Sequence, residues 1–229
     1  MNSQNGALTL RLVLFSAATL IFFTCVQSVR SAVYVYNSFG PGNTFVTYAD
    51  WGIQGASASG GYVGHGELFV PTLSGNLQSV QLALVTLSGG TSVANFYVAA
   101  NNGGTPGPVL ASFMNVVAPA SSSGSFLVTL NSVTQPLLQA GTTYWLYGEP
   151  AASTTAIGWL VNNQGYANNY AQENPPGVWT SGPVTFGANG VFDVSVTPVP
   201  EPSIAGLLIL GAGCFFIRRK RGSLVHTFA

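Results

Sequence analysis

Apolar and polar residues alternate along several short segments in the middle of the chain. In residues 77–87, Val80, Leu82 and Leu84 occupy every second position, which is the period of a strand with one buried face. Runs rich in Asn, Gly and Pro, such as residues 101–107, separate these segments and predict turns. Further strands are expected at residues 33–36, 93–100, 109–117, 125–130, 143–148, 156–161 and 191–197.

The middle of the chain shows no helical pattern. Between residues 32 and 198, apolar positions do not recur with the period of about 3.6 residues that an amphipathic helix requires. About ten short strands separated by turns are typical of a β-sandwich or a β-barrel. We therefore predict one all-β domain at residues 32–197, which is long enough to bury a single core.

An apolar segment near the N-terminus differs from this alternating pattern. Arg11 precedes a hydrophobic run that extends to Val26, and small residues follow at 28–32. A basic start, an apolar centre and a small-residue cleavage zone predict a secretory signal peptide at residues 1–31. Cleavage after Ser28, Ser31 or Ala32 fits this pattern. The alternative is an uncleaved signal anchor.

A second apolar segment, residues 204–217, is followed directly by the basic cluster Arg218, Arg219, Lys220 and Arg221. As a helix it would measure about 21 Å, less than the roughly 30 Å hydrocarbon core of a bilayer. The basic residues compensate, because they stay on the cytoplasmic side and their long side chains reach the interface. We predict a single C-terminal transmembrane helix that holds the domain outside. The alternative is a buried core helix.

The residues before this helix carry a recognisable triplet, Pro200, Glu201 and Pro202, after Val199. Triplet, apolar helix and basic cluster together resemble the PEP-CTERM sorting signal of Gram-negative bacteria, here at residues 198–221. The resemblance implies an exosortase, a membrane enzyme that cuts near the triplet, as a partner. Two prolines also prevent helix formation and keep the chain extended for such an enzyme. The tail at residues 222–229 is longer than is usual for this signal.

Charge is segregated along the chain. Six carboxylates and no Lys or Arg lie between Ala32 and Ser203, although the whole chain is neutral. This segment cannot neutralise phosphates, which excludes nucleic acid as a partner and argues against anionic substrates. Cys25 and Cys214, the two cysteines, lie in the apolar end segments. The domain is therefore expected to lack a disulfide, a cysteine nucleophile and a thiolate metal site.

Several short motifs inside the domain occur in the order found in bacterial "choice-of-anchor" domains, which precede surface-anchor signals. They lie at residues 66–71, 77–80, 101–110, 140–145 and 158–159. The chain resembles that group, and the resemblance implies a jelly-roll-like β-sandwich with no established activity.

Residues suited to catalysis are few. His65 and Glu67 are two positions apart, so on a strand they share a face and could bind a metal or act together. We favour a solvated strand edge, because Gly64 and Gly66 flank them. The sequence contains no nucleophile elbow, phosphate loop, zinc spacing or calcium loop. We expect no catalytic residues, no metal and no cofactor, although a glycosidase pair among the scattered acids stays open.

The segment at residues 162–179 is rich in amides and aromatic rings. Such side chains suit neutral sugars, and the proposed ligand contacts are Asn163, Tyr166, Tyr170 and Trp179. The alternative is an irregular surface loop with Trp179 in the core, and Trp145 and Trp159 are expected to be core residues. We predict an exported, membrane-anchored cell-envelope or extracellular-matrix protein with a non-catalytic structural or binding domain. A secreted carbohydrate-binding module or polysaccharide hydrolase is the alternative.

Overall fold

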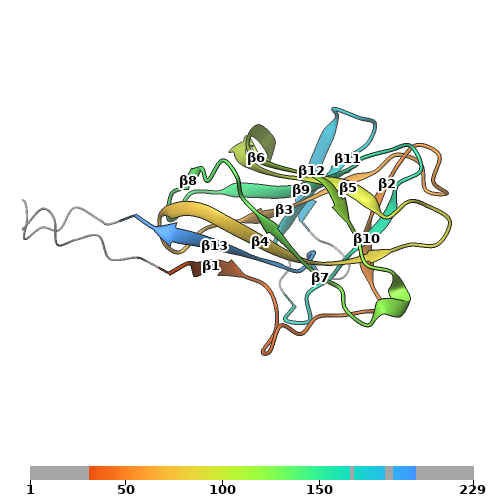
Figure 1. Cartoon of the computed structure of the whole chain (residues 1–229). Coiled ribbons are helices and arrows are strands. Elements are labelled where there is room, and N and C mark those ends of the chain that lie inside the picture. The colour runs from red at the N-terminus through yellow and green to blue at the C-terminus, as the bar shows by residue number, and fades with distance from the viewer. Residues whose placement is uncertain (1–30, 166–167, 184–187, 200–229) are drawn as a thin grey trace, which may run out of the picture. The chain divides into compact units, whose positions relative to one another are not determined.

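The computed structural model describes residues 31–165, 168–183 and 188–199. These residues form thirteen strands and one short 3-10 turn, joined by loops, and contain no α-helix. The strands form two antiparallel sheets, so the prediction of an all-β fold is confirmed (Figure 1). The elements are β1 Val33–Asn37, β2 Asp50–Gln54, β3 Gly64–Phe69, β4 Gly75–Thr86, β5 Val93–Asn102, β6 Thr105–Val117, η1 Ser121–Ser123, β7 Leu127–Asn131, β8 Leu137–Leu138, β9 Tyr144–Pro150, β10 Ala156–Leu160, β11 Asn169–Glu173, β12 Trp179–Pro183 and β13 Phe192–Pro198.

The first sheet has seven strands and is organised around β4. Its main order is β1-β13-β4-β10-β2, and β7 and β8 also pair with β4. With twelve residues, β4 is long enough to pair with four other strands. Because β1 and β13 are neighbours, both ends of the described domain lie in the same sheet, as Figure 1 shows at its left side.

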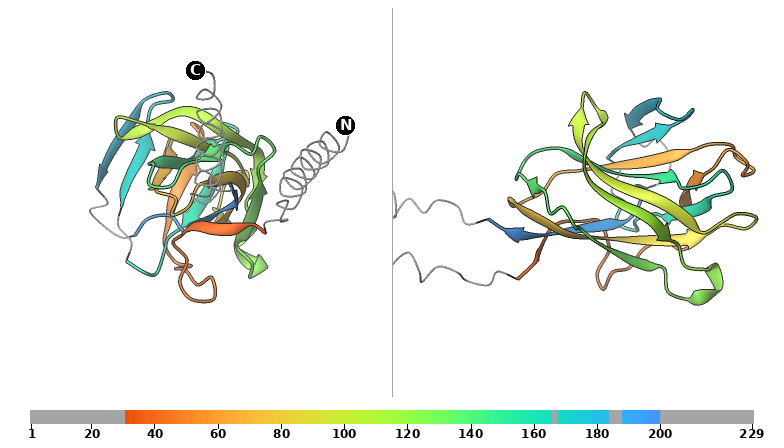
Figure 2. Two further views of the ribbon diagram at one scale, coloured as in Figure 1. Left: turned by 90° about the vertical axis from the view of Figure 1, so that its left-hand side faces the viewer. Right: turned by 45° about the horizontal axis from the view of Figure 1, so that its top comes forward.

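The second sheet has six strands in the order β12-β11-β3-β9-β5-β6. The hairpins β5–β6 and β11–β12 form its two edges, and both project to the side away from the seven-stranded sheet (Figures 1 and 2). The β5–β6 turn contains Gly103 and Gly104, both with positive φ, the region in which glycine meets no steric penalty. A Cβ placed on Gly104 would lie 3.7 Å from Ser181 Oγ, so this turn reaches β12.

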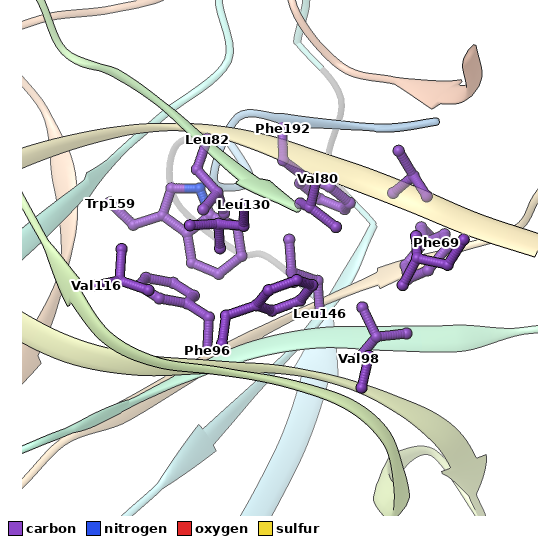
Figure 3. Close-up of a cluster of buried hydrophobic side chains, with 14 of the residues drawn as sticks. Phe69, Val80, Leu82, Phe96, Val98, Val116, Leu130, Leu146, Trp159 and Phe192 are labelled. Carbon is purple, nitrogen blue, oxygen red and sulfur yellow. The ribbon is translucent and has the colours of Figure 1, made fainter. Parts of the chain in front are cut away.

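The core lies between the two sheets and consists of the inward-facing residues of both. Trp159 is fully buried, with Phe96 and Phe192 at centroid distances of 5.7 and 5.8 Å from its ring. Figure 3 shows these rings surrounded by aliphatic side chains from both layers. This core explains the alternation of apolar and polar residues along the strands, because every second side chain points between the sheets and buries its apolar surface there.

Each of the eight predicted strands corresponds to an observed strand, with bounds that differ by at most four residues at either end. The sequence pattern missed β2, β3, β11 and β12, which are rich in Gly and polar residues, and β8, which is only two residues long. The alternative interpretation of residues 162–179, an irregular surface loop, is wrong in part, because β11 lies within this segment and β12 begins at Trp179. Backbone pairing in that hairpin leaves the polar side chains of Asn169, Thr180 and Ser181 free to face water.

The segments predicted to reach the membrane lie outside the described residues. This applies to the signal peptide, to Pro200, Glu201 and Pro202, to the apolar run at 204–217, and to the basic cluster at 218–221. Within the described residues, no helix has the length and apolar character needed to cross a bilayer.

The two sheets approach closely at Gly148 of β9. A Cβ there would lie 2.5 Å from Ile53 Cδ1 and 2.8 Å from Phe96 Cε1. We expect Gly148→Ala to destabilise the domain by about 1–3 kcal/mol, because overpacking forces neighbours out of their rotamers. Gly182→Ala is the matched control, since nothing lies within 4 Å of its added Cβ. Urea unfolding of both variants measures the difference, and equal midpoints would contradict this account.

Candidate functional site

The inner face of β3 carries a buried polar cluster. His65 and Glu67 are 2% and 1% exposed, and they face the core in line with Phe69 on the same strand. Glu67 Oε1 lies 2.8 Å from His65 Nε2 and accepts the Gly190 N–H at 2.6 Å. Glu67 Oε2 accepts a hydrogen bond from Asn189 Nδ2. These contacts tie β3 to the segment that leads into β13.

Aromatic rings enclose the His65 side chain. The Trp51 ring stacks on it at a centroid distance of 4.7 Å and 9° between planes, while Trp159 meets it edge-on at 5.9 Å. Tyr170 stacks on Trp51 at 5.3 Å. The prediction that His65 and Glu67 form a solvated strand edge is therefore wrong. The reason is tertiary, because β3 is a central strand between β11 and β9.

The contacts of the buried cluster indicate a structural role. Both oxygens of Glu67 are engaged by groups of the domain itself, and no buried side-chain N or O atom among the described residues lacks a partner. Nor do three His, Cys, Asp or Glu side chains come together as a metal-ligand set within that part of the chain. A substrate would have to displace these contacts before it could reach the carboxylate.

A second group of polar and aromatic side chains lies on the outer face of the six-stranded sheet. Glu173 on β11 pairs with Gly64 on one side and with Trp179 on the other, so Glu173 and Trp179 share this face. Tyr62 Oη donates a hydrogen bond of 2.6 Å to Glu173 Oε2, and the Gly177 N–H donates to Oε1. Glu173 is thereby held in place above β3.

Aromatic rings continue this group across the sheet. Tyr97 on β5 and Tyr147 on β9 are directly paired and stack at 4.9 Å with 23° between their planes. Trp179 meets Tyr147 edge-on at 5.0 Å. Gly66 lies beneath, and the absence of a side chain there leaves space that Trp179 and Tyr147 cover. We call this group the outer-face cluster, and its members are Tyr62, Tyr97, Tyr147, Glu149, Glu173 and Trp179.

Electrostatics distinguish the outer-face cluster from an ordinary surface. Burial and, secondarily, the nearby Glu173 carboxylate raise the pKa of Glu149 to about 7. Burial, followed by the hydrogen bond to Glu173, raises the pKa of Tyr62, and burial followed by the charge of Glu149 raises that of Tyr147. No Lys or Arg occurs between residues 31 and 199 to offset the two carboxylates. Tyr62, Tyr97, Glu149 and Trp179 are partly exposed, whereas Tyr147 and Glu173 are buried.

Of the four predicted ligand contacts, the three that the structure describes do not come together. Trp179 belongs to the outer-face cluster, whereas Tyr170 is the cross-strand partner of Glu67 and packs beneath the sheet. Asn163 is exposed and donates its Nδ2 to Thr44 Oγ1 at 3.0 Å. Tyr166 lies outside the described residues. Trp145 and Trp159 are fully buried, as expected.

Sequence reasoning missed most of the outer-face cluster. Tyr147 and Glu149 alternate along one strand, which was the one local signal that they share a face. Tyr62, Tyr97 and Glu173 come from distant parts of the chain, and no spacing in the sequence relates them.

Comparison with known proteins adds nothing to this geometry. No protein-family model, curated protein or solved structure matches the chain. The outer-face cluster is therefore interpreted from its own contacts and charges.

Proposed function

We propose that this chain is an exported cell-envelope or extracellular-matrix protein whose β-sandwich binds an extracellular polysaccharide without catalysing a reaction. The observation that carries the proposal is the outer-face cluster, where partly exposed Tyr97 and Trp179 lie beside two carboxylates. Aromatic faces stack on sugar rings, and phenols and carboxylates bind sugar hydroxyls. A sheet face with both kinds of group suits a polymer that lies across it.

Export and anchoring are proposed from the ends of the chain. A signal peptide at residues 1–31 would direct export, and the apolar run at 204–217 with its basic cluster would stop in the membrane. Resemblance of residues 198–221 to a PEP-CTERM signal supports processing by an exosortase at Pro200, Glu201 and Pro202. Resemblance to choice-of-anchor domains supports a jelly-roll-like arrangement of the sandwich, held at the surface of a Gram-negative bacterium.

A polysaccharide hydrolase is the second candidate, and one specific observation favours it. Glu149, with its pKa raised to about 7, is suited to act as a general acid beside a second carboxylate, Glu173. Against this, Glu173 is 3% exposed, and both its oxygens already accept hydrogen bonds from Tyr62 and Gly177. A nucleophile or base must reach the sugar carbon or a water beside it, so we favour binding over hydrolysis.

A glycan array and a hydrolase panel on the purified full chain separate these candidates. We expect retention of one class of polysaccharide and no release of reducing ends. Trp179→Ala should weaken binding by roughly three- to tenfold, because it removes a stacking surface. Tyr48→Ala is the control, since Tyr48 is 91% exposed and lies outside the cluster. Hydrolysis that Glu149→Gln abolishes would establish the enzyme, and absence of any glycan binding would contradict the proposal.

Anchoring is tested through the basic cluster. Replacing Arg218, Arg219, Lys220 and Arg221 with serine should release the protein from membranes or invert its orientation, because the positive residues fix the helix in place. Fractionation and protease accessibility of the tail measure this, and unchanged behaviour would contradict the assignment. Exosortase processing is tested separately, by measuring the intact mass of the protein isolated from the cell surface. We expect this form to lack the residues after Pro202.

A further inference from the structure

The outer-face cluster holds negative charge without a cation. The Glu173 carboxylate lies close enough to Glu149 to raise the pKa of Glu149. Among the described residues, the other titratable groups that interact with these two carboxylates are Tyr62, Tyr97 and Tyr147. Phenols donate hydrogen bonds but carry no positive charge. The nearest Lys or Arg in the sequence is Arg30 on one side and Arg218 on the other.

We propose that the outer-face cluster binds a cationic amino group, carried by a polysaccharide of amino sugars whose amines are free. Aromatic faces and carboxylates together are the combination that recognises organic cations in proteins. Tyr97 and Trp179 supply partly exposed rings, and Glu149 supplies a partly exposed carboxylate two residues after Tyr147 on the same face of β9. Because the cluster is negative and the domain lacks Lys and Arg, an acidic polysaccharide is disfavoured.

This inference rests on the proposed glycan-binding function and adds the chemical class of the ligand. A neutral sugar could stack on the aromatic rings and form some of the hydrogen bonds, but it would not reduce the repulsion between the two carboxylates. A bound ammonium group relieves that repulsion, so the free energy of binding gains an electrostatic part that an acetylated sugar cannot supply. The cluster should therefore discriminate between free and acetylated amines on otherwise identical sugars.

The test compares a glucosamine hexamer with an N-acetylglucosamine hexamer by titration calorimetry on the full chain. We expect the glucosamine hexamer to bind about tenfold more tightly, and Glu149→Gln to abolish this preference while both hexamers still bind. Asp50→Asn is the matched control, because it removes one carboxylate from β2 in the other sheet. Unfolding midpoints confirm that both variants are folded. Equal affinity for the two hexamers, or a preference that survives Glu149→Gln, overturns the inference and leaves glycan binding intact.

A quaternary ammonium probe separates the cation from the sugar. Choline keeps its charge at all pH values, so the change in its affinity reports on the protein alone. Glu149 gains its charge as pH rises through about 7, so choline affinity should increase by roughly fivefold or more between pH 6 and 8. The pKa of each of the three tyrosines is raised above its usual value of 10, so they stay protonated in this range.

The choline measurement also separates cation binding from glycan binding. If choline binds with this pH dependence and neither hexamer nor any glucan binds, the glycan-binding function and the amino-sugar assignment both fail. A choline affinity that does not change with pH, or that is unaffected by Glu149→Gln, overturns the role of Glu149 in cation binding.

Discussion

Replacing Glu67 with leucine is expected to lower the free energy of unfolding by about 3–5 kcal/mol, because it removes a buried acceptor and leaves its hydrogen-bonding partners unsatisfied. His65, the Gly190 N–H and Asn189 Nδ2 all direct hydrogen bonds to this carboxylate. With His65 and Glu67 at 2% and 1% exposed, water cannot replace the missing acceptor. Urea unfolding monitored by tryptophan fluorescence gives the loss.

The matched control is Asp50→Leu, the same kind of change at an exposed carboxylate. Its effect should stay within about 1 kcal/mol, as is usual for surface substitutions. If Glu67→Leu were no more destabilising than Asp50→Leu, the buried cluster would contribute little to the stability of the fold. A large loss for Glu67→Leu alone would show that the cluster joins β3 to the start of β13.

Trp159→Ala is expected to cost about 3–5 kcal/mol as well, for a different reason. The Trp159 ring is fully buried between the sheets, contacts Phe96 and Phe192, and donates its Nε1–H to the Val191 carbonyl at 2.9 Å. Truncation leaves a cavity that the surrounding strands can fill only in part, and an acceptor without its donor. Thermal and urea unfolding both measure this loss.

Trp179→Ala provides the comparison for Trp159→Ala, because it removes the same side chain from a partly exposed position on the outer face. Its cost should be about 1–2 kcal/mol, since less apolar surface returns to water. The two variants should therefore differ in their main effect: Trp159→Ala should lower mainly the stability of the domain, and Trp179→Ala mainly its affinity for the ligand. Equal stability losses would mean that Trp179 is a core residue and would weaken its assignment to a ligand-binding face.

The strands that could be predicted from the sequence are those whose inner face is uniformly apolar. β4 is the clearest example, because Val80, Leu82 and Leu84 repeat at the spacing of a half-buried strand. β3 could not be predicted in this way. Its inner face carries His65 and Glu67 before Phe69, and its outer face begins with Gly64 and Gly66. Neither face therefore shows the run of apolar residues that predicts a half-buried strand.

The candidate site was accessible to sequence reasoning only in part. Trp179 was identified because a tryptophan in a polar, amide-rich segment is conspicuous. Its partner Tyr62 could not be identified, because it lies in the loop before β3, far in sequence from Glu173, to which it donates a hydrogen bond. Tyr97 and Glu173 could not be identified either, because the register between β5, β9, β3, β11 and β12 brings them together. Register depends on long-range pairing, and a shift of one residue would move each of these side chains to the opposite face.

The sequence by itself determined the all-β class, most of the strands with apolar inner faces, and the lack of Lys and Arg throughout the domain. These features follow from local periodicity and composition, which need no knowledge of contacts. Tertiary structure alone decided that His65 and Glu67 are buried, because a polar pair is stable inside a core only when groups distant in sequence, here Asn189 and Gly190, satisfy it. Tertiary structure also decided that Glu149 and Glu173 share one sheet face. These two residues are 24 positions apart in the sequence, so their relative position depends on strand order and register.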